Sequence, residues 1–388
     1  MSRPDLLQRL AARHAERGRQ ALLRRLRTVQ AVQGPRVVVA GRALLNFASN
    51  DYLGLAQHPA LVEALVAAAG RWGVGATAAH LLGGHRDEHA ALEEELAAWT
   101  GRERALLFST GYLANLGVLG ALLQAGDLCV QDKWNHACLL DGARLAGAEL
   151  RRYPHADVAA ARRQLGALPD AAAVLATDAV FSMDGDLAPL SALAALCRGQ
   201  GALLHVDDAH GLGVLGPGGA GSVRAAGLTQ ADVPVLMATL GKALGVAGAF
   251  VAGSAALIEG LVQFARSHVF TTAMPPALAA ATRAAVRIAR FEDWRRDQLA
   301  RLITHFRHGA QARGIALLPS PTPIQPVVVG DSARALAVAR RSCVSAWSNS
   351  TWASTSLFLW VRCCALMSRS LSCVFSIFCS SARLRARR

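Results

Sequence analysis

Residues 203–211 read LLHVDDAHG, an apolar run that ends abruptly in two carboxylates and a histidine. A short continuous apolar run is typical of a buried strand in a parallel sheet, because helices cover both faces of such a sheet. A carboxylate at the end of a buried strand is costly unless it has a cationic partner. Asp207 is therefore a candidate binding residue, with His210 beside it. At this point the alternative is that Asp207 and Asp208 only close a turn.

The chain on either side of this run repeats the same pattern of apolar runs separated by helical segments. The apolar runs lie at 105–108, 173–176, 203–206 and 235–237, and the helical patterns lie at 115–124 and 190–198. This alternation predicts an α/β fold with an open, mainly parallel sheet and helices on both faces. Ligands bind such sheets beyond the carboxyl ends of the strands. Further along, the pattern predicts a long helical stretch over 277–309 and a strand of a smaller domain over 324–329.

Lysine is almost absent from this chain. Only Lys133 and Lys242 occur among the 41 basic residues, and the other 39 are arginines. An arginine stays protonated in a protein, whereas a lysine amine can lose its proton and condense with an aldehyde. Lys242 lies in a glycine-flanked turn, TLGKALG, just after the apolar run at 235–237. It is a candidate Schiff-base residue, and the alternative is an ordinary surface lysine.

Three further segments follow predicted strands. Gly111 and Tyr112 lie at a strand-to-helix junction, where backbone amides and the helix N-terminus favour a phosphate. His136 is placed either to stack on an aromatic ring or to remain a surface histidine. Ser182 lies in the turn FSMDGD, where it either binds a ligand or closes the turn.

Composition and charge exclude several classes of protein. The formal net charge is +14, but six of the basic residues lie beyond residue 341, and the remainder carries 35 − 27 = +8 without a basic stripe. No zinc-finger spacing or aromatic RNA-binding signature accompanies this charge, so we expect no nucleic-acid partner and no metal. No apolar stretch is long enough to span a membrane, and residues 1–27 lack the apolar centre of a secretory signal. We therefore expect a cytoplasmic protein with no membrane partner.

The composition changes near residue 342. Residues 342–388 contain no glycine, proline, aspartate or glutamate, whereas the preceding part holds all 35 glycines and all 14 prolines. Glycine and proline form the turns between the elements of a folded α/β pattern, and both are absent from this segment. We interpret this segment as an anomalous tail translated out of frame.

The motifs together resemble the α-oxoamine synthases, enzymes of fold type I that use pyridoxal 5'-phosphate (PLP). The resemblance covers about residues 5–341. It rests on NFASNDYLGL at 46–55, FSMDGD at 181–186, VDDAHG at 206–211, TLGK at 239–242 and TTAMPP at 271–276. It implies the PLP-dependent transferase fold, with a smaller C-terminal α+β domain. The expected organisation is an N-terminal arm at 1–45, a large PLP-binding domain at 46–285, the start of the small domain at 286–341, and the tail at 342–388.

The resemblance also implies roles for individual residues around the cofactor. Lys242 would form the Schiff base and then act as general base, and Asp207 would pair with the pyridine nitrogen. His210 and Ser182 would hold the ring hydroxyl, and His136 would stack on the ring. The phosphate would be bound by Thr239, by the backbone of Gly111 and Tyr112, and, from a partner subunit, by Thr271 and Thr272. Arg24 would bind the acyl substrate, and Asn50 and His136 would lie near the amino-acid substrate.

Within that family the sequence is most similar to the biotin-pathway branch, because glycine follows the histidine of VDDAHG. This branch implies a homodimeric acyltransferase that condenses L-alanine with a pimeloyl thioester and releases carbon dioxide. One alternative is a relative that joins glycine to another acyl-CoA, and another is an inactive dimer partner. The family's Arg-Pro-Pro-Thr segment and its following carboxylate-binding arginine are absent from the tail.

Overall fold

The computed structural model describes residues 3–342, 358–363 and 373–376, and it divides the chain into two compact units. The large unit comprises Asn50–Ser182 and Asp186–Ala300. The small unit comprises Met1–Ser49, Met183–Gly185 and Arg301–Arg388. The predicted tail lies outside the described residues except for Ser342 and two short strands.

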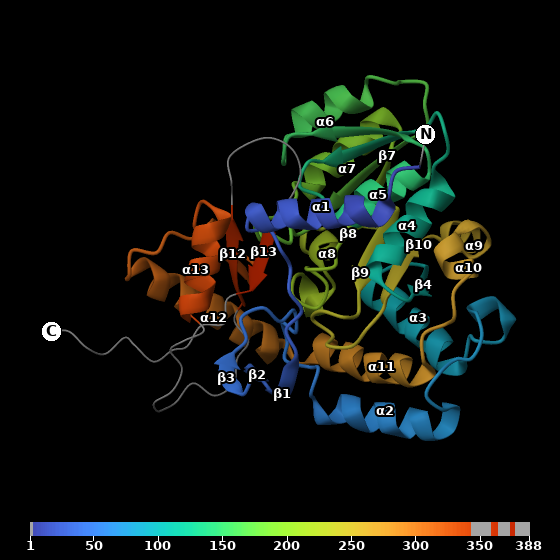
Figure 1. Ribbon diagram of the computed structural model, residues 1–388. Coiled ribbons are helices and arrows are strands. Elements are labelled where there is room, and N and C mark those ends of the chain that lie inside the picture. Colours follow the sequence, from blue (N-terminus) through green and yellow to red (C-terminus); the bar gives the residue numbers. More distant parts are fainter. Residues whose placement is uncertain (1–2, 343–357, 364–372, 377–388) are drawn as a thin grey trace. The chain divides into compact units, whose positions relative to one another are not determined.

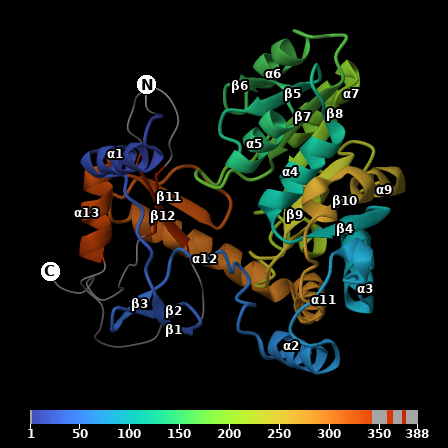
Figure 2. The same ribbon diagram turned by 45° about the vertical axis from the view of Figure 1, so that its right-hand side comes forward.

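The large unit is built on a seven-stranded sheet with the strand order β4-β10-β9-β8-β7-β5-β6. Strands β6, β5, β7, β8 and β9 run parallel, and β10 is antiparallel to both β9 and β4. The predicted mainly parallel sheet is thus confirmed (Figures 1 and 2). The strands are β4 (Arg104–Phe108), β5 (Leu128–Asp132), β6 (Glu149–Tyr153), β7 (Ala173–Asp178), β8 (Leu203–Asp207), β9 (Val235–Thr239) and β10 (Ala249–Gly253).

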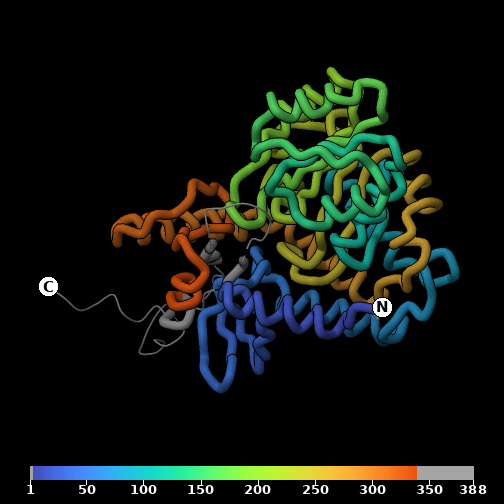
Figure 3. Tube along the Cα trace, turned by 45° about the horizontal axis from the view of Figure 1, so that its top comes forward, coloured from blue at the N-terminus to red at the C-terminus, as the bar shows by residue number. Residues whose placement is uncertain are grey.

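Helices cover both faces of this sheet, as side-chain alternation along β8 shows. Leu204 and Val206 pack into the core beneath α6 and α7, whereas Leu203 packs on the opposite face, toward α4 and α5. Successive strand residues point to opposite faces, so each strand contributes to two hydrophobic cores. Residues 105–255, apart from 183–185, belong to this unit (Figure 3). The helices here are α4 (Gly111–Leu122), α5 (Ala137–Leu145), α6 (Val158–Leu165), α7 (Leu190–Gln200), α8 (Ser222–Ala225), α9 (Ala255–Phe264) and α10 (Arg266–Val269).

The remaining helices of the large unit pack beside the sheet. Helix α11 lies along α2 and also contacts α3 (Figure 1). The bounds are α2 (Pro59–Trp72), α3 (Asp87–Thr100), α11 (Pro276–Phe291) and the 3-10 turns η1 (His80–Leu82) and η2 (Pro217–Gly219). Among the described residues, no helix is long and apolar enough to cross a membrane.

The helical stretch predicted over 277–309 is confirmed, but it forms two helices. The chain forms α11 and then α12 (Asp293–Gln311), with a break at Glu292, whose φ is −101° and ψ is 69°. The Glu292 carboxylate accepts hydrogen bonds from the side chains of Trp294 and Arg295. Asp293 begins the new helix, where an acidic residue is favoured by the helix dipole. These local polar contacts end α11 without a glycine or proline. The spacing of the apolar residues therefore gave no indication of the break.

The small unit begins with α1 (Leu6–Arg19) and a three-stranded antiparallel meander. Its strands are β1 (Val29–Gln33), β2 (Arg36–Val39) and β3 (Arg42–Leu45). Ala40 and Gly41 both have positive φ, which matches the tight turn that joins twisted antiparallel strands. The predicted strand at 324–329 is present as β11 (Ile324–Val328), which pairs in parallel with β12 (Phe358–Cys363). Strand β13 (Cys373–Ser376), helix α13 (Ser332–Ser342) and the part of α12 from Arg301 onward also belong to this unit.

Candidate active site

The register of the sheet brings several polar side chains to one edge. Asp178 at the end of β7 pairs with Asp207 at the end of β8, and Asp207 pairs with Met237 on β9. The carboxyl ends of these three neighbouring strands therefore lie side by side. The turns that follow β8 and β9 carry His210 and Lys242. The polar cluster at this edge is the candidate site, in agreement with the general rule for open α/β sheets.

Three side chains form a line within this cluster. The Lys242 Nζ atom lies 2.8 Å from His210 Nε2, and His210 Nδ1 lies 2.7 Å from the Tyr52 hydroxyl. Tyr52 is only 4% exposed and His210 only 9% exposed. The histidine is thus held between an amine and a phenol with little access to water.

Asp207 is fixed by two donors. Asn115 Nδ2 donates to its Oδ2 atom at 2.7 Å, and the Ala209 amide donates to Oδ1 at 3.0 Å. Asn115 lies on α4 and is fully buried, so its amide holds the carboxylate in one orientation. Each carboxylate oxygen still has a lone pair for a further donor.

His136 lies beside this carboxylate at the N-cap of α5. Its backbone amide donates to Asp178 Oδ2 at 2.8 Å, and its Nδ1 atom lies 2.9 Å from Cys138 Sγ. Burial lowers the pKa of His136 below its ordinary value, so the ring favours the neutral state. A neutral planar ring fixed through its backbone is suited to stacking.

The electrostatics of Lys242 result from two opposing effects. Burial lowers the pKa of its amine, while the carboxylates of Asp207 and Asp178 act in the opposite direction, and the net pKa is lowered. The pKa of His210 falls well below its ordinary value because of burial and the nearby Lys242 charge. Lys242 therefore loses its proton more readily than an exposed lysine, as a nucleophilic amine must.

Asp208 does not face this cluster. Its carboxylate accepts hydrogen bonds from the Ser222 amide at 2.6 Å and from the Ser222 hydroxyl at 2.5 Å. Burial raises its pKa to about 7. A Cβ atom on Gly221 would lie 2.2 Å from Asp208 Oδ2, and Gly221 has a φ of +97°. Asp208 therefore anchors the loop that carries His210.

The sequence and fold of the chain match known proteins over most of its length. The family model for class I and II aminotransferases matches residues 42–367. A protein from Pseudomonas putida (strain GB-1), named 8-amino-7-oxononanoate synthase, is 57% identical over 85% of each chain. A protein of the same name from Cellvibrio japonicus is 54% identical over 86% of this chain and 83% of its own.

The chain belongs to the class I and II aminotransferases, in the 8-amino-7-oxononanoate synthase family. Solved structures agree with this. Serine palmitoyltransferase from Sphingomonas wittichii has a TM-score of 0.85 at 28% identity and covers 97% of this chain and 93% of its own. The 8-amino-7-oxononanoate synthase of Francisella tularensis has a TM-score of 0.71 at 27% identity, covering 87% and 92%.

The residues present fit the PLP that the family suggests. Lys242 offers an amine with a lowered pKa, and Asp207 offers oriented lone pairs for a pyridine nitrogen. Gly111 begins α4, whose N-terminal amides and dipole favour a phosphate. Thr239 ends β9, where its hydroxyl donates to the Gly248 carbonyl at 3.0 Å and accepts from the Gly241 amide at 3.3 Å. Tyr112 follows Gly111 and points its hydroxyl to the Asp141 carboxylate.

Other residues expected in the site have varied surroundings. Asn50 Oδ1 lies 3.5 Å from the Tyr52 hydroxyl, next to the cluster. Ser182 is half-buried in the turn after β7. Thr272 forms an isolated bridge with Ala79, and Thr271 lies beside it. Arg24 is exposed after α1 in the small unit.

Sequence reasoning missed two members of the cluster. Tyr52 lies within the NDYLG motif but received no role, and Asn115 was only part of a predicted helix. For Asn115 there was a signal, since it is a polar residue in the otherwise apolar helix that follows β4. For Tyr52 the motif indicated importance, but its partner lies 158 positions away and could not be named.

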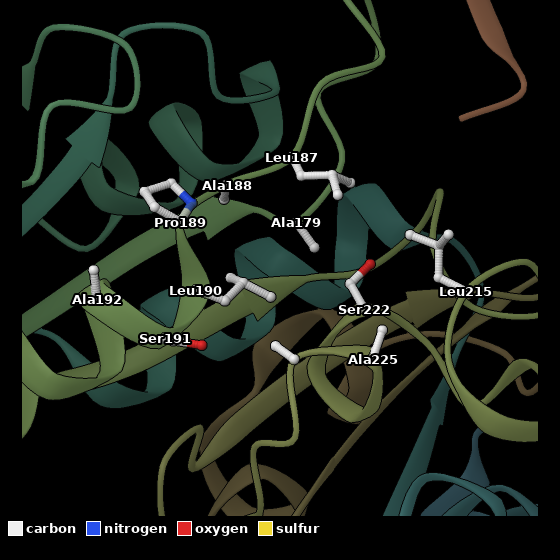
Figure 4. Close-up of a pocket in the computed structure, with 11 residues that line it drawn as sticks. Ala179, Leu187, Ala188, Pro189, Leu190, Ser191, Ala192, Leu215, Ser222 and Ala225 are labelled. Carbon is white, nitrogen blue, oxygen red and sulfur yellow. The ribbon is translucent and has the colours of Figure 1, made fainter. Parts of the chain in front are cut away.

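A separate apolar cavity of about 430 Å³ is lined by none of the residues of this polar cluster (Figure 4). Its wall includes Leu187, Leu190 and Leu215, whose side chains surround the opening, and Ser222 contributes one of its few polar atoms. It contains no titratable side chain. The cavity therefore offers no group for acid–base chemistry, and the cluster around Lys242 remains the candidate active site.

Proposed function

We propose that this chain is a PLP-dependent 8-amino-7-oxononanoate synthase acting in biotin biosynthesis. It joins the pimeloyl group of a thioester to the α-carbon of L-alanine. The alanine carboxylate leaves as carbon dioxide and the carrier thiol is released, so that 8-amino-7-oxononanoate is the product. The observation that carries this proposal is the Lys242 amine, 2.8 Å from a buried neutral histidine and close to the oriented carboxylate of Asp207.

PLP, when bound, supplies an electron sink for the carbanion that forms at the α-carbon of the amino acid. The protein's own residues bind and orient it. Asp207, held by Asn115, would keep a proton on the pyridine nitrogen, and His136 would stack on the ring. Lys242 would be the amine that holds the cofactor aldehyde, and its lowered pKa would suit the free amine to accept a proton from the α-carbon of the amino acid.

Phosphate binding is assigned to Thr239 and to the backbone of Gly111 and Tyr112. Ser182 and His210 are assigned to the ring hydroxyl. Asn50 is assigned to the amino-acid carboxylate and Arg24 to the acyl substrate.

The choice of alanine and a pimeloyl thioester is supported by relatives of that name at 54–57% identity. The thioester carrier is either coenzyme A or a carrier protein. The alternatives, a glycine-dependent acyltransferase and an inactive dimer partner, differ in measurable ways. Retention of Lys242 favours an active enzyme over an inactive partner.

We also propose a homodimer in which Thr271 and Thr272 reach the phosphate of the partner subunit's cofactor. Val74, Leu82 and Phe270 are 89%, 79% and 72% exposed in the single chain, and a second subunit would cover them. The expected cytoplasmic location stays a prediction.

Purified protein with PLP should consume L-alanine and pimeloyl-CoA and release 8-amino-7-oxononanoate, identified by mass spectrometry. Glycine and L-serine in place of alanine are the matched controls, and light scattering gives the oligomeric state. Turnover of glycine with no turnover of alanine would overturn the assigned substrate. Failure to develop a borohydride-sensitive absorbance with PLP would overturn the assigned chemistry.

A further inference from the structure

Tyr52 reaches the candidate active site through a hydrogen bond to His210. The imidazole ring has two nitrogens, and each has one close partner: Lys242 Nζ at 2.8 Å and the Tyr52 hydroxyl at 2.7 Å. All three residues belong to the large unit. None of the roles described above requires the Tyr52 hydroxyl.

The ring nitrogen of His210 that carries the proton depends on whether Lys242 is charged. The ring is neutral, because burial and Lys242 hold its pKa well below the ordinary value. A lysine ammonium group can only donate, so His210 Nε2 must then accept and Nδ1 must carry the proton. An uncharged amine offers a lone pair, which allows Nε2–H to donate and leaves Nδ1 as an acceptor.

Only a group that both donates and accepts can satisfy Nδ1 in both states. A phenol hydroxyl does this by rotating its proton. When Lys242 is charged, the Tyr52 oxygen accepts from Nδ1–H and its own proton faces Asn50 Oδ1, 3.5 Å away. When Lys242 is neutral, the Tyr52 hydroxyl donates to Nδ1. Burial raises the pKa of Tyr52 far above its ordinary value, so the hydroxyl keeps its proton throughout.

We propose that Tyr52 is a positioning residue for Lys242: acting through His210, its hydroxyl supports both tautomers of the ring and so holds the lysine amine in place in both charge states. This inference rests on the proposed function only in taking Lys242 as the reacting amine. In this role Tyr52 acts through His210.

Other groups around Lys242 do not duplicate this role. Asp207 and Asp178 favour its charged form, as does Cys138, and His136 is a further titratable group nearby. These groups act through charge, whereas Tyr52 acts through the direction of a hydrogen bond. In the charged state, the chain from Lys242 through His210 to Tyr52 is charge-assisted and each bond polarises the next. Removing the hydroxyl therefore costs the charged state more than the neutral state.

The near-absence of lysine gives a direct test. Cofactor-free protein labelled with [13Cε]lysine has only two lysine signals, from Lys242 and Lys133. In Tyr52→Phe the titration midpoint of Lys242 should fall by roughly half a unit to one unit relative to the wild type. Tyr153→Phe is the matched control, since Tyr153 is another buried tyrosine, on β6, and it should leave the midpoint unchanged. An unchanged Lys242 midpoint in folded Tyr52→Phe overturns the proposal.

A second measurement uses the wild-type protein and so does not depend on whether Tyr52→Phe folds. Nitrogen-15 spectra of the histidine side chains, with His210 assigned by its loss in His210→Gln, report which ring nitrogen carries the proton. We expect the proton on Nδ1 below the Lys242 midpoint and on Nε2 above it. A ring that keeps one tautomer across that midpoint overturns the proposal. Neither measurement uses cofactor or substrate, so inactivity toward alanine and pimeloyl-CoA would refute the proposed function and leave this result standing.

Discussion

Glu93→Gln should make the protein more stable at neutral and alkaline pH. Glu93 lies on α3 and points inward, where its Oε1 atom accepts the Leu107 amide at 2.9 Å and Oε2 lies 3.7 Å from His85 Nε2. Burial raises the pKa of this carboxyl from 4.5 to about 7. A glutamine has nearly the same shape, stays neutral, and can still accept the Leu107 amide through its own oxygen.

The sign and size follow from proton linkage. A carboxyl whose pKa is raised in the folded state binds its proton more tightly there than in the unfolded chain. Its contribution to stability is therefore complete below pH 4.5 and is lost as the pH rises to about 7. The difference of 7 − 4.5 = 2.5 units corresponds to roughly 3 kcal/mol at about 1.4 kcal/mol per unit. The variant avoids this loss, so its advantage should grow from about zero near pH 4.5 to roughly 3 kcal/mol above pH 7.

The assay is urea unfolding of the cofactor-free protein, followed by circular dichroism between pH 5 and pH 8. Glu94→Gln is the matched control, because Glu94 is the next residue on α3 and is exposed. Burial lowers the pKa values of the nearby histidines His80, His85 and His268, but these groups titrate in the wild type and in both variants. The reasoning is refuted if the free-energy difference between Glu93→Gln and the wild type stays constant over this pH range.

Three other predictions concern the site and the tail. Lys242→Ala should abolish the borohydride-sensitive absorbance of the PLP-loaded protein, whereas Lys133→Ala should keep it; a band that survives in Lys242→Ala excludes Lys242 as the attachment residue. Asp207→Asn should retain PLP but slow exchange of the alanine α-proton by at least about tenfold, because a neutral amide cannot keep the pyridine nitrogen protonated. Asp208→Asn should have a much smaller effect on that exchange rate, and equal rates in the two variants would contradict the roles assigned to them. For residues 342–388, resequencing of the gene should reveal an Arg-Pro-Pro-Thr-like run in another frame, and a confirmed frame with full activity of the 388-residue chain would refute the frameshift interpretation.

The sheet could be predicted because its buried strands are short continuous runs of apolar residues. The apolar runs at 105–108, 173–176, 203–206 and 235–237 became β4, β7, β8 and β9 within two residues at each end. A strand that is buried on both faces must be apolar throughout. Few other elements of secondary structure require a continuous apolar run this short. The break at Glu292 could not be predicted in this way, because it depends on side-chain hydrogen bonds and not on the apolar period.

The site was predicted in part for the same reason. Asp207, His210 and Lys242 follow strand ends that lie side by side in a parallel sheet, so the sequence order already implied that they meet. The partners Tyr52 and Asn115 come from a turn and a helix far away in sequence. Their contacts depend on the exact packing of α4 and of the NDYLG turn, which no local pattern specifies.

Hydrogen bonds explain how the fold tolerates several buried ionisable groups at the carboxyl edge of the sheet. Asp178 and Asp207 are buried neighbours, and burial together with the Asp207 charge raises the pKa of Asp178 well above its ordinary value. Two buried carboxylates and one lysine would be costly if all were charged without compensation. Asp207 instead accepts from Asn115 and Ala209, and Asp178 accepts from the His136 amide. The same donors that reduce the cost of burial also orient Asp207 and place His136. Stability and site geometry are therefore set by one set of hydrogen bonds, and for this reason Asn115→Ala should impair both folding and cofactor binding, whereas a surface change on α4 should impair neither.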